Sequence, residues 1–294
     1  VVDEGRMPPW HANPAYGEFD NARHMPEEAK KTLREWVRAG MPYGNSEDLP
    51  APLSLTKGWR LPHSPDQIVS MSKRDFVVPA DGTVEYQYFV VDPGFEEDKW
   101  VTGAQIVPGN PRVVHHSIVF VRPPDGSAFR GIGWLTAYVP GTRAGAFPAG
   151  HAIKVPAKSK LVFQQHYTPN GTEQSDQTTL GLTFGKDEEI THEVYTLVGI
   201  DQEFEIPPQV ENHVVRNQVR YLPKHATLRS IMPHMHLRGK SFRLVAAQGA
   251  SESILLDVPH YDFNWQHAYR LREPLPLHAI DKLKFEVAFD NSPS

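Results

Sequence analysis

The sequence predicts a mainly β protein: two antiparallel, jelly-roll-like β-sandwich domains preceded by a short helical segment. Three observations favour this class. The chain contains 27 prolines and 21 glycines, which interrupt helix interiors and central strands and so favour many short strands. Its 294 residues exceed one ordinary sandwich and suit two domains. From Gln67 onward, β-rich runs alternate with turn residues, which is typical of sandwiches rather than of a parallel sheet.

The composition excludes several classes of protein. Hydrophobic residues make up 39% and charged residues 22%, as in a globular protein. The net charge is -5 without a basic stripe, so we expect no nucleic-acid partner. No apolar run is long enough for a transmembrane segment. Cysteine is absent, so disulfides are excluded and any metal must be bound by nitrogen, oxygen or Met sulfur.

One helix is predicted between Pro26, in a first-turn position, and Gly40, at the C-terminal stop. Its apolar residues recur at helical spacing, namely Ala29, Leu33, Trp36 and Val37. The following stretch, residues 41–65, is rich in Pro, Gly and Ser and is predicted to be a linker.

The predicted strands fall into two series. The first comprises residues 84–91, 112–121, 161–167 and 178–184, and the second comprises residues 194–198, 227–236, 242–246, 253–256 and 284–289. Residues 185–193 break the pattern between them. We therefore predict an N-terminal segment over residues 1–50, a first sandwich over 51–190 and a second sandwich over 191–294.

Among the 15 histidines, His234 and His236 form the most informative pair. They end a β-rich run, and residues two apart on a strand point to the same side, at roughly 6–7 Å between Cα atoms. This spacing predicts two imidazoles that bind one Cu or Zn ion, with nitrogen bonds of about 2 Å.

His115 and His116 are adjacent within another predicted strand, and His166 ends a later one. On a regular strand one of the two adjacent residues faces inward and the other outward. Both can bind one metal only if the strand is twisted or bulged there. With His166, they would give a three-nitrogen site of the kind that copper favours. Gln164 should share a strand face with His166, where it could accept a hydrogen bond from a ligand imidazole.

Together, the His115-His116 pair, HYTPNG at residues 166–171 and HMHLRG at residues 234–239 resemble the copper type II, ascorbate-dependent monooxygenases, the family of peptidylglycine α-hydroxylating and dopamine β-monooxygenase. The resemblance covers about Gln67 to Asn291. It implies two β-sandwich domains with one copper each. His115, His116 and His166 would bind the electron-supplying copper, and His234 and His236 would bind the catalytic copper that meets dioxygen.

The chain departs from the family pattern at three points. The family's third ligand at the oxygen site is a Met well downstream of the HxH pair, which would fall beyond Ser294. Met232 stands where the peptide-processing members have an Arg that holds the substrate carboxylate, so a peptidyl-glycine substrate is not expected. The animal enzymes are rich in disulfides, whereas this chain has no Cys, so it looks like a bacterial relative.

The first fifty residues resemble the C-terminal part of a cytochrome c-like domain, through RMPPW at residues 6–10 and the helix that ends at Gly40. Met7 would then be the axial ligand of haem c in the full-length protein, with the CxxCH motif upstream of Val1. The alternative is that Met7 packs against Trp10 as a core residue.

The resemblance implies a copper-dependent monooxygenase that hydroxylates a C–H bond of a small organic substrate with dioxygen. Its electron donor would be an ascorbate-like reductant or an attached or partner cytochrome c, and its location periplasmic or secreted. Two alternatives remain. A non-catalytic copper-binding or electron-transfer module, or a redox partner subunit, would need no third ligand at the oxygen site. A mononuclear zinc hydrolase would need a carboxylate base, and HMHLRG has none beside it.

Overall fold

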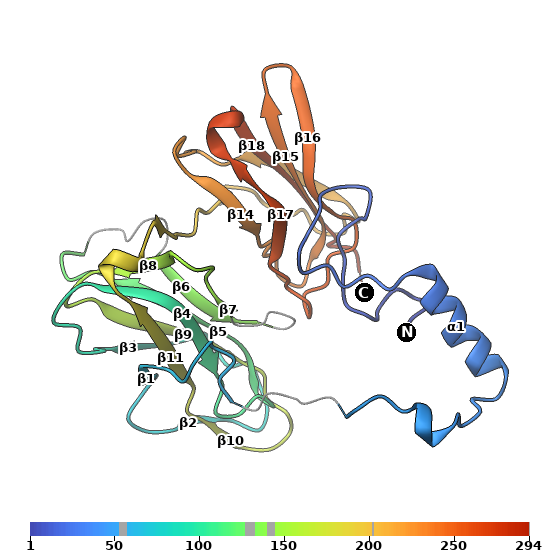
Figure 1. Cartoon of the computed structure of the whole chain (residues 1–294), viewed down its shortest axis with the longest axis horizontal. Helices are drawn as coiled ribbons and strands as arrows, with labels where there is room; N and C mark the ends of the chain where they lie inside the picture. Colours follow the sequence, from blue (N-terminus) through green and yellow to red (C-terminus); the bar gives the residue numbers. More distant parts are fainter. Residues whose placement is uncertain (53–57, 127–132, 140–144, 202, 294) are drawn as a thin grey trace. The chain divides into compact units, whose positions relative to one another are not determined.

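The computed structural model describes all residues except 53–57, 127–132, 140–144, 202 and 294. Its described part is mainly β, with several antiparallel sheets and one α-helix near the N-terminus, which confirms the predicted fold class (Figure 1). The chain divides into two compact units. We call Thr56–Val198 the middle unit, and Val1–Leu55 together with Gly199–Ser294 the end unit.

The middle unit contains two main sheets. The first has the order β1-β11-β4-β8-β12, with β7 also paired to β4, and the second has the order β3-β9-β5-β6. The first sheet is built from β1 (Gln67–Ser70), β4 (Lys99–Val107), β7 (Gly145–Ala146), β8 (His151–Val155), β11 (Thr179–Gly185) and β12 (His192–Glu193). The second is built from β3 (Gln87–Val91), β5 (Val114–Arg122), β6 (Trp134–Tyr138) and β9 (Lys160–Tyr167). A two-stranded sheet joins β2 (Phe76–Val78) to β10 (Gln174–Asp176), and a 3-10 turn, η2, covers Asp187–Glu189.

The core of the middle unit is formed by side chains from both of its main sheets. Strand β9 shows how the sequence produces it, because its odd-numbered residues 161–167 are buried and the even-numbered residues between them are only half-buried. Leu161 and Phe163 pack in one cluster with Val119 of β5 and with Leu180 and Leu182 of β11. This alternation leaves position 166 on the outer face of the sheet.

A buried polar group fixes the end of β9 on the inner face. Asp176, only 2% exposed, accepts hydrogen bonds from the Tyr167 hydroxyl at 2.9 Å and the Thr178 hydroxyl at 2.8 Å. Its other carboxylate oxygen accepts from the backbone N–H of Asn110 at 2.9 Å. A buried carboxylate with several donors is stable only while those donors stay in place. The network therefore holds the chain next to position 166 in one register.

The end unit contains a four-stranded sheet of order β13-β18-β15-β16 and a pair of β14 with β17. Their bounds are β13 (His213–Gln218), β14 (Thr227–Ile231), β15 (Gly239–Gln248), β16 (Ser251–Val258), β17 (Tyr269–Pro276) and β18 (Lys282–Phe289). Two 3-10 turns, η1 (Ser46–Asp48) and η3 (Leu277–Ala279), and helix α1 (Glu27–Arg38) belong to the same unit.

The N-terminal segment packs on the strands of the end unit. Phe19, 5% exposed, forms a β-bridge with Leu271, and the backbone N–H of Asn13 donates to the carbonyl of Asp257 at 2.8 Å. The Trp10 ring lies 4.9 Å from the Tyr269 ring. The assignment of residues 1–50 to a cytochrome c-like domain stays a prediction, and in this structure they share a compact unit with Gly199–Ser294.

The predicted helix is confirmed as Glu27–Arg38. Pro26 precedes its first residue, and Gly40 follows it at a φ of +81°, which glycine adopts without steric cost. None of its residues is buried. The apolar side chains Leu33, Trp36 and Val37 remain exposed.

Two strand predictions are wrong. Residues 194–198, which follow β12, form no strand. Their side chains are half-buried, and that of Val194 packs against the core of the middle unit. The strand predicted over residues 227–236 ends at Ile231, since Pro233 has no N–H to donate to a ladder. Part of the predicted linker, residues 53–57, lies outside the described residues.

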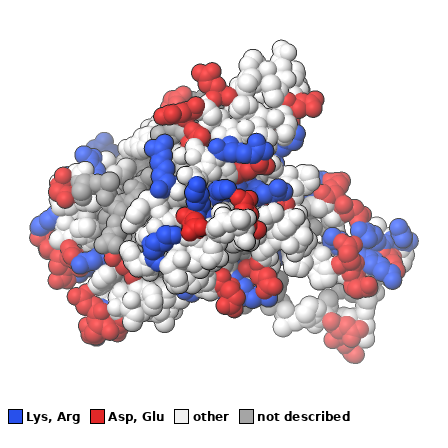
Figure 2. All heavy atoms as spheres, turned by 90° about the horizontal axis from the view of Figure 1, so that it is seen from above, with Lys and Arg blue, Asp and Glu red and all other residues white. Residues whose placement is uncertain are grey.

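No helix among the described residues is both long and apolar enough to cross a membrane. On the face shown in Figure 2, Lys and Arg side chains are interspersed with Asp and Glu. The charges on that face therefore form no field of one sign.

We predict that Tyr167→Phe lowers the free energy of unfolding by about 1–3 kcal/mol, because it removes a buried donor to Asp176. Urea denaturation measures the change. Tyr88→Phe is the matched control, because the Tyr88 hydroxyl accepts a hydrogen bond from Gln164 but the side chain is 59% exposed. That change should cost at most about 0.5 kcal/mol. Equal losses in the two variants would contradict a stabilising role for the Asp176 network.

Candidate metal centres

A β-bulge lies where β5 meets β9. Val114 pairs with Tyr167 and His116 pairs with His166, so the register shifts by one residue and His115 is the extra residue on β5. An extra residue locally breaks the alternation of side chains and bends the strand. His115 and His116 can therefore face the same point, which a regular strand would prevent. The bulge that the sequence analysis required is present.

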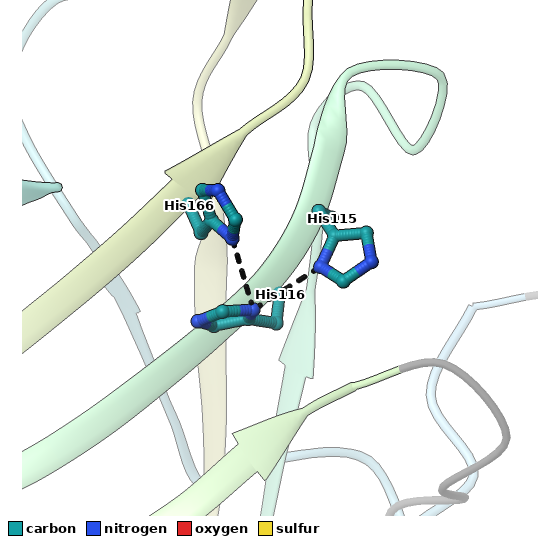
Figure 3. Close-up of side chains that lie close together, drawn as sticks. All are labelled: His115, His116 and His166. Carbon is teal, nitrogen blue, oxygen red and sulfur yellow. Dashed lines mark hydrogen bonds between the residues drawn. The ribbon is translucent and has the colours of Figure 1, made fainter. Parts of the chain in front are cut away.

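The bulge brings three imidazoles together on the outer face of the sheet (Figure 3). The Nδ1 atom of His116 lies 3.2 Å from Nδ1 of His115 and 3.4 Å from Nδ1 of His166. One ring nitrogen from each residue lies within 4.8 Å of the others. Tetrahedral metal–nitrogen bonds of about 2.0–2.1 Å place ligand nitrogens about 3.3 Å apart. The three residues fit one metal ion after small rotations of the rings.

The surroundings favour neutral imidazoles at this cluster. His116 is 2% exposed, and His115 and His166 are half-buried. Burial lowers the pKa of His115, because desolvation disfavours the charged ring. A neutral ring keeps the lone pair that a metal requires. His115 is therefore prepared to bind a cation rather than a proton.

Tyr86 covers one side of the cluster, and the sequence analysis did not single it out. Its ring centroid lies 4.9 Å from that of His166 and 5.7 Å from that of His116. Burial raises the pKa of Tyr86, so its hydroxyl stays protonated. Its position in the run predicted as a strand over residues 84–91 was the available signal, but the sequence does not show that this run lies beside β9.

A cleft of about 290 Å³ adjoins the cluster at His115. Its lining residues are Pro111, Arg112, Val113, Val114, His115, Tyr138 and Thr168. Small-molecule pockets in proteins begin at about 300 Å³ and combine apolar walls with a few polar groups. A small molecule can therefore reach the edge of the cluster from solvent.

Gln164 shares the outer face of β9 with His166, as predicted. Its amide Nε2 donates to the Tyr88 hydroxyl at 2.9 Å. This hydrogen bond joins Gln164 to Tyr88 and not to a histidine. The role of Gln164 as an acceptor for a ligand imidazole stays a prediction.

His234 and His236 do not lie on a strand, which corrects the sequence analysis, because β14 ends at Ile231. Their rings are nevertheless adjacent, with centroids 5.2 Å apart at an angle of 82°. Met235 between them is buried, whereas both histidines are exposed. The two imidazoles therefore leave the chain on the same side, as an extended segment requires.

Tyr261 holds the backbone between these two histidines. Its hydroxyl accepts from the N–H of Met235 at 3.0 Å and donates to the carbonyl of Met235 at 2.7 Å. Burial raises the pKa of Tyr261 to about 12, so the hydroxyl keeps the proton that it donates. Gly239 is needed next to this segment, since a Cβ there would lie 2.6 Å from Cβ of Met235. These contacts hold the backbone of the segment in place, where no strand pairing does so.

Gln266 fixes the tautomer of His234, and the sequence analysis missed it. It is 0% exposed, and its Nε2 donates to the carbonyl of Phe263 at 3.0 Å. Its Oε1 therefore faces Nδ1 of His234, at 2.7 Å, so Nδ1 must carry the hydrogen. The Nε2 lone pair of His234 is left for a metal, the usual arrangement at metal-binding histidines. No periodicity marks Gln266, because it lies between strands.

The pair has fewer protein donors than the cluster. Among the described residues, no third His, Cys, Asp or Glu joins His234 and His236 in a metal-binding group. The pair would offer a metal two nitrogens, and Gln266 fixes the tautomer of the ring that supplies one of them.

Met7 is 46% exposed and is therefore not a core residue. Its role as a haem ligand stays a prediction.

Comparisons with known proteins give no family. No protein-family model matches the chain, and no curated protein matches it. A chain from the work titled "Life in the extremes: atomic structure of Sulfolobus Turreted Icosahedral Virus" is 10% identical, and the alignment covers 82% of this chain and 100% of that one. Its TM-score of 0.19 is too low to support an argument about fold or function.

We predict that Gln266→Ala weakens metal binding at the His234–His236 pair by about 10–100-fold, because the ring loses the acceptor that fixes its tautomer. Calorimetric titration with Cu²⁺ measures the change. Gln248→Ala, at the exposed end of β15, is the matched control and should leave binding unchanged. Unaltered affinity in Gln266→Ala would show that the hydrogen bond does not prepare His234.

Proposed function

We propose that this chain is a copper-dependent monooxygenase that hydroxylates a C–H bond of a small organic substrate with dioxygen. The observation that carries the proposal is the cluster of His115, His116 and His166 at one β-bulge. A second, differently built imidazole pair in the end unit supports two separate metal centres. The motifs quoted in the sequence analysis point to the same chemistry.

The donor set favours copper over zinc chemistry. Both metals accept imidazole. A mononuclear zinc hydrolase also uses a carboxylate as base. The metal-binding group of the described residues consists of histidines alone. A nitrogen-only group without a carboxylate suits copper in electron transfer better than zinc in hydrolysis.

The two centres differ in a way that suits two roles. His116 is almost fully buried, and three nitrogens leave little of a metal's coordination to exchangeable ligands. His234 and His236 are exposed and supply only two nitrogens, so positions remain for small ligands. When bound, copper would supply electron transfer at the first centre and dioxygen activation at the second. We therefore assign His234 and His236 to the catalytic centre.

The remaining parts of the proposal rest on the family resemblance. The electron donor is an ascorbate-like reductant or an attached or partner cytochrome c, and the protein acts in the periplasm or outside the cell. The cleft beside His115 is of a size that admits a small reductant. Met232 at the position discussed above makes a peptidyl-glycine substrate a poor candidate.

A second candidate is a non-catalytic copper-binding or electron-transfer module. One observation favours it, namely that no third His, Cys, Asp or Glu of the described residues joins His234 and His236. Dioxygen uptake separates the candidates. Copper-loaded protein with ascorbate should consume dioxygen in a manner that His234→Ala abolishes if the chain is an oxygenase, whereas a carrier is reduced and reoxidised without such uptake.

The proposal predicts two coppers per chain that survive dialysis, with one lost in His166→Ala and the other in His234→Ala, because each change removes a ligand from a different unit. Metal analysis after dialysis gives the stoichiometry. His63→Ala and His278→Ala, exposed histidines of the middle and end units, are the controls and should retain both ions.

Electron paramagnetic resonance identifies which centre remains in each variant. His234→Ala should retain the signal of the three-nitrogen centre, and His166→Ala should retain the other. If both variants lose the same single ion, the chain has one centre and the two-copper proposal is wrong.

A further inference from the structure

A second pair of histidines lies on the other main sheet of the middle unit. His151 and His192 stack with ring centroids 4.5 Å apart and planes inclined by only 7°. They face each other in register across β8 and β12, the one parallel pairing among the described strands. In-register residues on neighbouring strands project to the same side of a sheet. Both rings therefore leave the sheet together.

The local backbone fixes this arrangement. The carbonyl of Gly150 accepts from the backbone N–H groups of Thr191 and His192, each at 2.9 Å. Gly150 has a φ of +74°, and a Cβ there would lie 2.6 Å from the Thr191 hydroxyl oxygen. Only glycine permits both the turn and the close approach. These backbone contacts hold His151 and His192 next to each other.

Hydrogen bonds fix the tautomer of both rings. Nδ1 of His151 lies 3.0 Å from the carbonyl of Ala149, which can only accept, so Nδ1 carries the hydrogen. The Thr191 hydroxyl donates its one hydrogen to the carbonyl of Gly150 at 3.2 Å. With that hydrogen on the carbonyl, the hydroxyl accepts from Nδ1 of His192, at 2.9 Å. Both Nε2 atoms are left with a bare lone pair.

We infer that His151 and His192 form a surface site for a divalent first-row transition metal ion, bound through their two Nε2 atoms. A hydrogen bond from Nδ1 to a protein acceptor is the arrangement that prepares a histidine for metal binding through Nε2. Here both rings have it. The side chains of the two rings must turn out of their stacked arrangement for both lone pairs to reach one ion at about 2 Å, with water completing the coordination.

The site takes its selectivity from imidazole donors. The affinity should follow the order Cu²⁺ above Ni²⁺ above Co²⁺, with Zn²⁺ below Cu²⁺. His192 is exposed and His151 half-buried, so the ion exchanges with solvent. The site lies on β8 and β12, whereas the three-histidine cluster lies on β5 and β9 of the other sheet. It therefore does not rest on the proposed monooxygenase function.

The test uses a readout that separates this site from the other histidines. Cu²⁺ is titrated into the ¹⁵N-labelled full chain, and paramagnetic broadening is followed at the amides of residues 150–153 and 191–194. We expect broadening of these amides to saturate in the wild type, and the local affinity to fall at least about tenfold in His192→Ala. His63→Ala, an exposed histidine of the same unit, should behave as the wild type.

A second variant tests the tautomer. Thr191→Val keeps both imidazoles but removes the acceptor for Nδ1 of His192, so the affinity should also fall while amide shifts away from the site stay unchanged. The inference is overturned if Cu²⁺ leaves these amides unbroadened, or if the broadening persists at the same affinity in His192→Ala. Ni²⁺ binding tighter than Cu²⁺ would also contradict it.

Discussion

The bulge in β5 is the constraint on which the candidate chemistry depends. A one-residue slip of a strand moves every side chain to the opposite face, so the position of the bulge decides which histidines meet. His115 is the added residue, and His116 pairs directly with His166. On the inner face, the next residue of β9, Tyr167, is fixed by its hydrogen bond to buried Asp176. The packing that stabilises the sandwich thus also sets the register of the three-histidine cluster.

In the end unit, contacts other than strand pairing bring the imidazoles of His234 and His236 together. Its histidine pair lies in an irregular segment, where a tyrosine hydroxyl replaces the sheet ladder and a buried glutamine fixes a tautomer. Strand pairing gives a closed cluster of three nitrogens, whereas the irregular segment leaves two exposed rings. The difference in openness between the centres is therefore a consequence of local backbone structure. It also suits the electron-transfer and ligand-binding roles that we propose for the two sites.

The sequence was sufficient for the fold class, the helix and eight of the strands, because alternation and turn residues are local signals, but it missed other strands, such as β4 and β17. It also identified the His115, His116 and His166 group, with the bulge stated as the condition. It overlooked one local signal, because Pro233 lies inside the run predicted as a strand and the strand ends at Ile231. It failed where long-range contacts decide, because Gln266 and Tyr261 reach the histidine pair from a segment without periodicity. The His151–His192 pair depends on a parallel pairing that no local pattern reveals.

The most direct test of this account is anomalous diffraction from crystals of the full chain soaked with copper. The account predicts one copper at about 2 Å from a nitrogen of each of His115, His116 and His166, a second copper between His234 and His236, and an exchangeable ion at His151 and His192. A copper held by only one of the first three histidines, or no copper at the bulge, would contradict the claim that this strand defect assembles a metal centre.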